Sequence, residues 1–499
     1  MRPRNLGFIL VFAALGLGAC AGPSVIVSGD AVRSPEPAPP QIAFKVVDRE
    51  QREPIEAQVS FGENVGTADE TGAVSLEWDE TPTQLIVNAP GFHPDSTLIT
   101  TFPEDGLYEV ELNPVILEGT ITTPDGKPLS SAIVSLGSVV DETDSTGRYR
   151  LERVTAGELR INRPAWESIT TRWNGDDPRI DVTMSPLMIK ALRVNAEKTA
   201  SPAAWKNILA LAARSEVNAL VLDTRNEDGI IFHKTNVELA NEIGAVRDFY
   251  DVERALADMD AAGLYKITRI VTFQDNPLAK ARPDLAVIDN TTGQPWKNNK
   301  GLRWLDPTNR DSWKLALDLA EEACELGFDE IQFDYVRFPS DGNIKTLSFK
   351  EPYTEEVRVA TITAFLQEAH DLLNPLGCAV AADIFAITLE SGWDEGIGQS
   401  PAELSNVIDV LSPMIYTYTY GPGWKGFDNP NNYPVEIVSA ALDAGIPKLE
   451  GTSIYRPWIQ TWQLNAGEIV AVQNVAEKRD LGWMIWSANS IYDDSFLLP

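Results

Sequence analysis

The sequence predicts a multidomain protein, in which two small all-β sandwich modules are followed by an α/β (β/α)8 barrel, the TIM barrel. Residues 41–113 and 114–186 carry the same pattern of short alternating strands with Asp and Gly turns, which is typical of antiparallel sheets. From residue 187 to residue 499, apolar strands alternate with helical segments, which indicates βαβ units. This last stretch holds eight candidate strands in roughly 310 residues, the usual size of a TIM barrel.

Residues 1–20 have the pattern of a targeting segment. Arg2 and Arg4 give a positive start, residues Leu6–Leu17 are almost wholly apolar, and Leu17-Gly-Ala-Cys20 follows. This arrangement resembles a bacterial lipoprotein signal, and the resemblance implies cleavage before Cys20, acylation of that cysteine and attachment to a membrane. An ordinary secretory signal with an incidental cysteine is the alternative.

Residues 21–40 are rich in Pro, Ser, Gly and Ala, a composition typical of a semi-rigid tether. Ala21, rather than an Asp, follows the cysteine. By analogy with bacterial lipoproteins, this implies sorting to the outer membrane of a Gram-negative cell. We therefore expect a lipid-anchored protein of the cell envelope.

The two β modules have the pattern of a tandem repeat. Val59 corresponds to Val134 and Gly72 to Gly147, so that 134 − 59 and 147 − 72 both give a shift of 75 residues. The second module resembles the carboxypeptidase regulatory-like domain in three short motifs, Gly119-Thr-Ile, Gly126-Lys-Pro-Leu and Thr146-Gly-Arg-Tyr. That resemblance implies a spacer or a binding unit, and it points to no catalytic residue.

The composition narrows the possible function classes. Lys and Arg number 41 against 73 Asp and Glu, a net charge of −32, which argues against nucleic acid as a partner because phosphates would be repelled. Three cysteines are too few for a disulfide framework, and we expect Cys324 and Cys378 to be buried small apolar residues. The three scattered histidines match neither a zinc site nor a Ser-His-Asp triad, so we expect no metal or cofactor and assign the chemistry to carboxylates.

Glycines stand at the helix-to-strand turns of the C-terminal domain, residues 187–499, as helix C-caps do. The alternative fold, an open doubly wound sheet, normally carries a Gly-rich phosphate-binding loop after its first strand, and the sequence lacks one. We expect this domain to fold independently of the β modules. Its predicted strands are Ala191–Ala196, Ala219–Thr224, Tyr265–Phe273, Phe328–Phe333, Ala379–Phe385, Val410–Tyr416, Lys448–Ile454 and Gly482–Trp486.

The fourth predicted strand carries the most chemistry. A helix is predicted to end at Gly327, a short apolar strand follows, and Asp334, Tyr335 and Arg337 come where that strand ends. In parallel α/β proteins catalytic groups collect at this end of the strands, so Asp334 is a candidate catalytic residue. The alternative is a structural ion pair between Asp334 and Arg337.

Asp383 is the most informative single residue, because it lies inside the apolar run Ala379–Phe385. An unpaired ionised carboxylate there would cost several kcal/mol, roughly, so the group is either paired or has a raised pKa. A raised pKa suits the general acid of glycoside cleavage, whereas the alternative is a structural acid bonded to backbone or to an arginine. Asp383 and Asp334 come from neighbouring strands about 4.8 Å apart, which allows the separation of about 5–5.5 Å of a retaining pair.

The other predicted strand ends bring acids, tyrosines and tryptophans to the same mouth. Indole faces cover the apolar faces of sugars while carboxylates bond their hydroxyls, so this composition favours a carbohydrate substrate. Trp304 and Trp424 fall in predicted loops, where core packing explains them poorly. The candidate substrate-binding residues are Asp223, Arg269, Trp304, Tyr335, Arg337, Tyr416, Trp424, Arg456 and Trp486.

Several motifs spread over the C-terminal domain are shared with a known family: Val217-Asn-Ala-Leu-Val-Leu-Asp223, Ile267-Thr-Arg-Ile-Val-Thr-Phe273, Trp304-Leu-Asp-Pro-Thr-Asn309, Gly327-Phe-Asp-Glu-Ile-Gln-Phe-Asp334-Tyr-Val-Arg337, Asp409-Val-Leu-Ser-Pro-Met-Ile-Tyr416 and Arg456-Pro-Trp-Ile-Gln460. In these motifs the domain resembles the "putative glycosyl hydrolase domain" family, once described as a domain of unknown function and related to the TIM-barrel glycosidases. The resemblance implies a barrel of glycosidase ancestry.

The resemblance also implies roles for the acids. In related barrel glycosidases the acid on strand 4 is the nucleophile, which implies that role for Asp334. The acid on strand 5 is often Glu in such families, so Glu450, on predicted strand 7, is the substitute candidate for the acid/base role beside Asp383. We therefore expect an envelope glycoside hydrolase that cleaves a poly- or oligosaccharide by a two-carboxylate, retaining mechanism. The alternative is a non-catalytic carbohydrate-binding or envelope scaffold lipoprotein on a degenerate glycosidase barrel.

Overall fold

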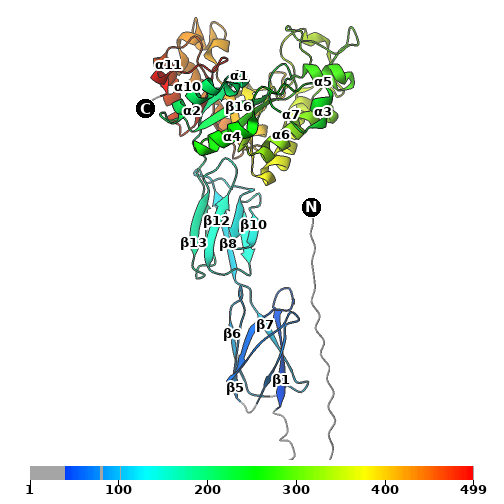
Figure 1. Cartoon of the computed structure of the whole chain (residues 1–499), viewed down its shortest axis with the longest axis vertical. Coiled ribbons are helices and arrows are strands. Elements are labelled where there is room, and N and C mark those ends of the chain that lie inside the picture. Colours follow the sequence, from blue (N-terminus) through cyan, green and yellow to red (C-terminus); the bar gives the residue numbers. More distant parts are fainter. Residues whose placement is uncertain (1–39, 79–81, 102, 498–499) are drawn as a thin grey trace, which may run out of the picture. The chain divides into compact units, whose positions relative to one another are not determined.

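The computed structural model describes residues 40–78, 82–101 and 103–497, and the predicted targeting segment with Cys20 lies outside them (Figure 1). The chain divides into two compact units: Met1–Ala89 with Pro94–Leu112, and Pro90–His93 with Asn113–Pro499. A search of the described residues finds no helix that is both long and apolar enough to cross a membrane.

The first unit is a pair of small sheets around one core. One sheet has the order β4-β1-β7 and the other β3-β2-β5-β6, and β1 runs antiparallel to β4 but parallel to β7. Ile42, Phe44 and Val46 alternate along β1 and are fully buried, because the two-residue period of a strand turns them to the same face. The strands are β1 (Gln41–Asp48), β2 (Gln58–Phe61), β3 (Asn64–Thr67), β4 (Ala73–Glu77), β5 (Thr83–Asn88), β6 (Asp95–Ile99) and β7 (Leu107–Leu112).

The second unit begins with strands in the same order, β11-β8-β14 and β10-β9-β12-β13. The repeated glycines Gly72 and Gly147 have φ angles of 76° and 72°, and a Cβ on either would lie 2.4 Å from a backbone oxygen, that of Val46 or Ile121. Only glycine fits such a turn, which explains why the repeat is visible in the sequence. The strands are β8 (Ile116–Thr122), β9 (Ile133–Leu136), β10 (Val139–Glu142), β11 (Arg148–Glu152), β12 (Gly157–Asn162), β13 (Ile169–Trp173) and β14 (Val182–Thr183).

The rest of the second unit is a closed barrel of parallel strands with helices around it (Figure 1). The strands follow in the order β15-β16-β17-β19-β21-β22, then β23 and β24 in turn, then β25, which pairs with β15 and closes the ring. The predicted TIM barrel is therefore confirmed and the open sheet is excluded. The strands are β15 (Lys190–Val194), β16 (Ala219–Arg225), β17 (Tyr265–Val271), β19 (Glu330–Asp334), β21 (Ala379–Phe385), β22 (Val410–Met414), β23 (Ile454–Tyr455), β24 (Trp458–Gln460) and β25 (Trp483–Trp486).

The seventh strand differs from its prediction at Lys448–Ile454. A 3-10 turn, Ile446–Lys448, prolongs the preceding helix, so the strand starts only at Ile454. Pro457, which has no N–H to donate, separates the two short pieces β23 and β24.

The helices of the barrel connect its strands. Helix α6 ends at Gly327, whose φ of 107° lies in the left-handed region, as a C-cap glycine requires. A short pair of strands, β18 (Ile288–Asp289) and β20 (Leu347–Ser348), joins two of the loops. The helices are α1 (Ala196–Ala200), α2 (Pro202–Ala212), α3 (Glu238–Glu242), α4 (Val252–Ala261), α5 (Asn276–Ala281), α6 (Lys314–Leu326), α7 (Glu355–Leu373), α8 (Ile387–Glu390), α9 (Pro401–Leu404), α10 (Pro434–Gly445) and α11 (Ala466–Glu477).

The second β module and the barrel share a hydrophobic core. Trp166 of the module packs in one cluster with Ala381 and other side chains from the starts of the barrel strands. Arg163 of the module also forms a buried ion pair with Asp409 of the barrel, at 3.3 Å. The structure therefore does not separate the chain at residue 187, and we now expect the barrel to depend on the second module for its stability.

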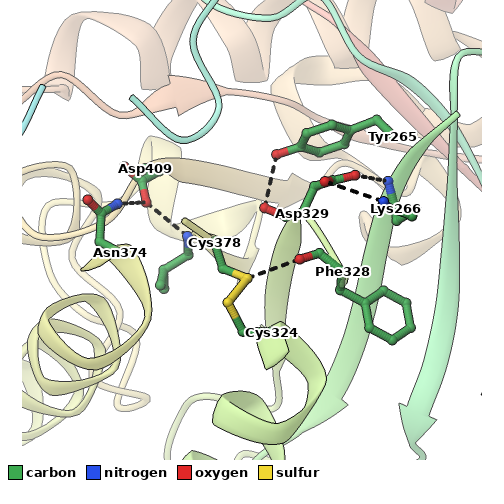
Figure 2. Close-up of a disulfide and its surroundings, with 9 residues drawn as sticks. Tyr265, Lys266, Cys324, Phe328, Asp329, Asn374, Cys378 and Asp409 are labelled. Carbon is green, nitrogen blue, oxygen red and sulfur yellow. Dashed lines mark hydrogen bonds and ion pairs between the residues drawn. A yellow bond between two sulfur atoms is a disulfide. The ribbon is translucent and has the colours of Figure 1, made fainter. Parts of the chain in front are cut away.

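The expectation that Cys324 and Cys378 are unpaired is wrong, because they form a disulfide with a Cα–Cα distance of 6.0 Å (Figure 2). Cys324 lies near the end of α6, which leads into β19, and Cys378 immediately precedes β21. The disulfide thus joins the starts of two neighbouring strands. The two cysteines are 54 residues apart in sequence, and the pairing of β19 with β21 brings them together.

Candidate active site

Asp334 and Asp383 lie at the same height on two neighbouring parallel strands. β19 and β21 pair through Phe333 and Ala382, and the two acids are the next residues on their strands. Gln332, two residues before Asp334, points into the barrel, where its amide approaches side chains of β22 and β25. The two-residue period of the strand turns Asp334 the same way, so both acids face the interior at the C-terminal mouth.

Asp334 is held by Arg269 of the adjacent strand β17. The Nε and Nη2 groups of Arg269 donate to Asp334 Oδ2 at 2.9 and 2.6 Å, and the backbone N–H of Tyr335 donates to Oδ1 at 2.7 Å. Both side chains are buried. Charge-assisted hydrogen bonds of this kind fix the orientation of the carboxylate and pair it with a permanent cation.

Arg269 contacts two further carboxylates. Its Nη2 donates to Glu227 at 2.5 Å, its Nη1 lies 3.4 Å from Asp223, and Asp223 also forms an ion pair with Arg193. Burial acts to raise the pKa of Glu227, but the charges of Arg269 and Arg193 and the hydrogen bonds that Glu227 accepts together outweigh it and lower this pKa to about 2. Three carboxylates and two arginines therefore form one charged network at the ends of β15, β16, β17 and β19.

Asp383 has a different environment. Its side chain is 1% exposed, and Trp458 Nε1 donates to its Oδ1 at 2.7 Å. Burial raises the pKa of Asp383 well above its ordinary value and the negative charge of Asp334 raises it further, while Arg269 and the Trp458 hydrogen bond only partly oppose the rise. Asp383 therefore keeps its proton at pH values at which an ordinary carboxyl group has lost it. Trp458 is bonded to Oδ1, so Oδ2 is the oxygen that can carry this proton.

The mouth has a charged half and an aromatic half. The charged half is the network of Arg193, Asp223, Glu227, Arg269 and Asp334. The aromatic half comprises Tyr416, Trp458, Trp462 and Trp486, which belong to or follow β22, β24 and β25. Trp486 joins the two, because its ring lies 4.5 Å from the Arg193 guanidinium carbon and 4.9 Å from that of Arg269.

A hollow of about 450 Å³ opens on the charged half. Charged and amide side chains line it, Arg193, Asp223 and Glu227 among them. Concave sites with a few convergent polar groups are typical of small-molecule and saccharide binding. The hollow adjoins Asp334 through the shared contacts of Arg269.

The structure brings together many of the residues that the sequence suggested. Asp223, Arg269, Asp334, Asp383 and Trp486 all lie at the mouth. Tyr416 joins them: burial and then the charges of Asp383 and Asp334 raise the pKa of its phenol. Trp424 is partly exposed, in the loop that follows β22.

Glu450 and Arg456 are not brought to the mouth. Because the seventh strand starts late, Glu450 precedes it at the opposite end of the barrel, where its N–H donates to Ser405 and its carbonyl oxygen lies 3.4 Å from Lys127 of the β module. Arg456 is buried in the barrel interior and donates to both carboxylate oxygens of Glu330, at 2.8 and 2.9 Å. We therefore withdraw Glu450 as an acid/base candidate and Arg456 as a sugar ligand.

Trp304 and Arg337 also take other places than expected. Trp304 is fully buried in the core, so its ring has no face for a sugar. The Arg337 guanidinium carbon lies 4.8 Å from the Trp304 ring and 5.0 Å from the ring of Tyr335, while its Nη1 donates to the Phe338 carbonyl oxygen. The ion pair considered between Asp334 and Arg337 is replaced by the pair of Asp334 with Arg269.

Two charged residues of the site, Arg193 and Glu227, were not among the candidates from the sequence. Arg193 is a charged residue inside a predicted apolar strand, which is the same signal that singled out Asp383, and it could have been found. Trp458 is part of the shared motif Arg456–Gln460, and what the motif did not show is its hydrogen bond to Asp383. Glu227 lies in a loop after β16, where no pattern marks it.

A TIM barrel with paired carboxylates and an aromatic half-ring at its mouth defines the class of carbohydrate-active barrels. Residues 191–492, more than half of the chain, match the family described as "Putative glycosyl hydrolase domain", and the chain belongs to that family. This match confirms the resemblance noted in the sequence, and it assigns the chain to the glycoside hydrolases.

Several solved structures are similar to part of this chain. A hypothetical protein from Ruminiclostridium thermocellum ATCC 27405 is 36% identical over 38% of this chain and 96% of its own, with a TM-score of 0.36. The glycoside hydrolase domain of PgaB (BpsB) from Bordetella bronchiseptica is 13% identical over 62% of this chain and 97% of its own, with a TM-score of 0.46. That of PelA from Pseudomonas aeruginosa is 11% identical over 61% and 96%, with a TM-score of 0.37. Among curated proteins no match is found.

Proposed function

We propose that the protein is a retaining glycoside hydrolase of the cell envelope, with Asp334 as nucleophile and Asp383 as general acid and base. One observation carries this proposal, the unequal environment of two neighbouring carboxyl groups. Asp334 is paired with the permanent cation Arg269, whereas Asp383 is buried against the neutral indole of Trp458. Unequal environments of this kind assign one carboxyl group to the ionised role and the other to the protonated role.

The reaction follows from these two roles. Asp334 attacks the anomeric carbon, the glycosidic C–O bond breaks, and Asp383 transfers its proton to the leaving oxygen. Asp383, now ionised, then takes a proton from a water molecule whose oxygen attacks the same carbon and displaces Asp334. Each step inverts the anomeric carbon, so the product retains the configuration of the substrate.

Arg269 serves both steps. Asp334 loses its negative charge when it forms the glycosyl ester, while Asp383 gains one when it gives up its proton. The net charge of the two acids is therefore constant through the first step. Arg269 interacts electrostatically with both acids, so it remains neutralised throughout.

The envelope location rests on two features of the chain. Residues 1–20 have the pattern of a lipoprotein signal that would acylate Cys20. The disulfide between Cys324 and Cys378 supports export, because such bonds persist mainly in oxidising compartments. A Cys20→Ser variant, followed through membrane fractionation, tests the anchor, and unchanged processing and partitioning would refute it.

The activity is tested with the soluble chain that lacks residues 1–20, on a panel of polysaccharides and aryl glycosides. Asp334→Asn is expected to remove nearly all turnover while sugar binding and the melting temperature persist, and Glu450→Gln is the matched control that keeps full activity. Proton NMR of the first product should show the substrate's anomeric configuration. If Asp334→Asn keeps most of the wild-type kcat, the nucleophile is wrongly assigned. Saccharide binding without any hydrolysis would favour the non-catalytic scaffold.

A further inference from the structure

The segment from Tyr416 to Tyr433, here the aromatic loop, joins β22 to α10 and is unusually rich in aromatic residues. It contains Tyr416, Tyr418, Tyr420, Trp424, Phe427 and Tyr433. Two of them are open to solvent, since Tyr418 is 55% and Tyr433 is 42% exposed. Single exposed aromatic residues need no explanation, but such a cluster beside an active site does.

The aromatic loop is held in place at both sides. Lys425 forms an ion pair at 2.8 Å with Glu390 of α8, the helix that follows β21. On the other side, the buried amide of Gln460 at the end of β24 accepts from the Tyr418 N–H at 3.1 Å and donates to Asn431 at 2.9 Å. The loop is therefore tied to the elements on both sides of β22, the helix after β21 and the end of β24.

Its rings also contact one another and the aromatic half of the mouth. Tyr416 and Trp462 are edge-to-face at 5.1 Å, and Tyr420 and Trp424 are edge-to-face at 4.7 Å. Tyr433, one of the two exposed rings, also packs against Phe427 at 4.6 Å. This contact orients Tyr433 before any ligand binds, which lowers the entropic cost of stacking a sugar on it.

The position of Asp383 determines which part of a bound substrate lies next to the aromatic loop. Asp383 pairs in register with Ser412 of β22, the strand from which the loop emerges. As the acid, Asp383 contacts the glycosidic oxygen, and the leaving group begins at that oxygen. Asp334 and the hollow lie on the charged half and hold the sugar that is attacked. The leaving group therefore extends over the aromatic half.

We propose that the aromatic loop is a platform for the leaving-group part of a polysaccharide, and that it binds at least two sugar units there by stacking. The assignment to the leaving group rests on the proposed function, because Asp383 defines that side. It deepens that function by giving the enzyme a preference for chains over glycosides with a small leaving group.

The test uses the chain without residues 1–20 and compares aryl glycosides with di- to hexasaccharides of the cello-, chito- and malto- series. Tyr418→Ala is expected to raise the KM for the longest cleaved oligosaccharide about tenfold and to leave aryl glycoside turnover unchanged. Tyr418→Phe, which keeps the ring, should behave as wild type. Trp393→Ala is the matched control, because Trp393 is 52% exposed but lines a separate groove between α7 and α9. If Tyr418→Ala leaves every KM unchanged, or raises it equally for aryl glycosides, the platform is refuted.

Binding separates this proposal from the proposed function. In the Asp334→Asn background, hexasaccharide binding is measured by calorimetry with and without Tyr418→Ala. Loss of binding in the double variant supports the platform even if no hydrolysis is ever observed, and in that case it is the proposed reaction that fails. Equal binding in both variants refutes the platform even if the enzyme is active.

Discussion

Asp334 and Asp383 stand side by side on two hydrogen-bonded strands, and Arg269 donates its hydrogen bonds to Asp334 and not to Asp383. Trp458, a neutral donor, is bonded to Asp383 instead. The two aspartates on neighbouring strands therefore have different partners: Asp334 is bonded to a cation and Asp383 to an indole. The difference affects stability as well as catalysis, and both can be measured.

The raised pKa of Asp383 makes stability depend on pH. The folded chain holds this proton more tightly than the unfolded chain, so the contribution is fully present below the unfolded pKa of about 3.9 and is lost as pH rises through the folded pKa. Asp383→Asn carries no such proton. Its melting temperature should exceed that of the wild type at alkaline pH, and the gap should close toward about pH 4. Calorimetric scans across pH measure it, and a gap of the same size at every pH would contradict the assignment.

Arg269 should be indispensable to the fold as well as to the reaction. Arg269→Met leaves three buried or half-buried carboxylates without their shared cation, which should lower the free energy of unfolding by roughly 3–5 kcal/mol and abolish activity. Arg214→Ala is the control, because its ion pair with Asp494 is exposed and should contribute at most about 1 kcal/mol. Urea unfolding curves of the two variants provide the comparison. Equal urea midpoints for the two variants would show that Arg269 does not stabilise the network.

The second β module should be required for a stable barrel. A chain that starts at Leu187 exposes the shared core and leaves Asp409 buried without Arg163, so we expect aggregation or a broad thermal transition. A chain that starts at Asn113 keeps these contacts and should unfold cooperatively. Near-UV circular dichroism and light scattering distinguish the two. Cooperative unfolding of the shorter chain, at the same temperature, would show that the module adds no stability.

The disulfide should add measurable stability. Replacing Cys324 and Cys378 by Ser, or reducing the protein, removes a cross-link between residues 54 apart and should cost roughly 2–4 kcal/mol. Melting curves with and without dithiothreitol test this in the wild type, and the double Ser variant should be insensitive to the reductant. If dithiothreitol lowers the melting temperature of both proteins equally, its effect does not come from this disulfide.

The sequence predicted the barrel well because its signals are local. Apolar runs and helix-ending glycines, such as Gly327, mark seven of the eight strands, and Asp383 was found because an acid inside an apolar run is conspicuous. The seventh strand was misplaced because residues 449–453, predicted as strand, are irregular chain that leads into it, and Glu450 was misassigned with them.

What the sequence could not supply depends on pairing across the barrel. The Arg269–Asp334 pair and the Trp458–Asp383 hydrogen bond join residues 65 and 75 positions apart. Trp304 looked like a loop residue because nothing local shows that Arg337 and the core enclose it. Such contacts follow from the pairing and order of the barrel strands, which no short stretch of sequence encodes.

The disulfide lies at the opposite ends of the two strands that carry the acids, since Cys324 precedes β19 and Cys378 precedes β21. A slip of one residue between these strands would turn one acid out of the barrel, because side chains alternate between its inner and outer faces. In the reduced chain the hydrogen-bond ladder and the buried side chains resist that slip, whereas in the oxidised chain a covalent cross-link does as well. The disulfide therefore helps to fix the spacing between the two carboxyl groups from the end of the strands that lies away from the substrate.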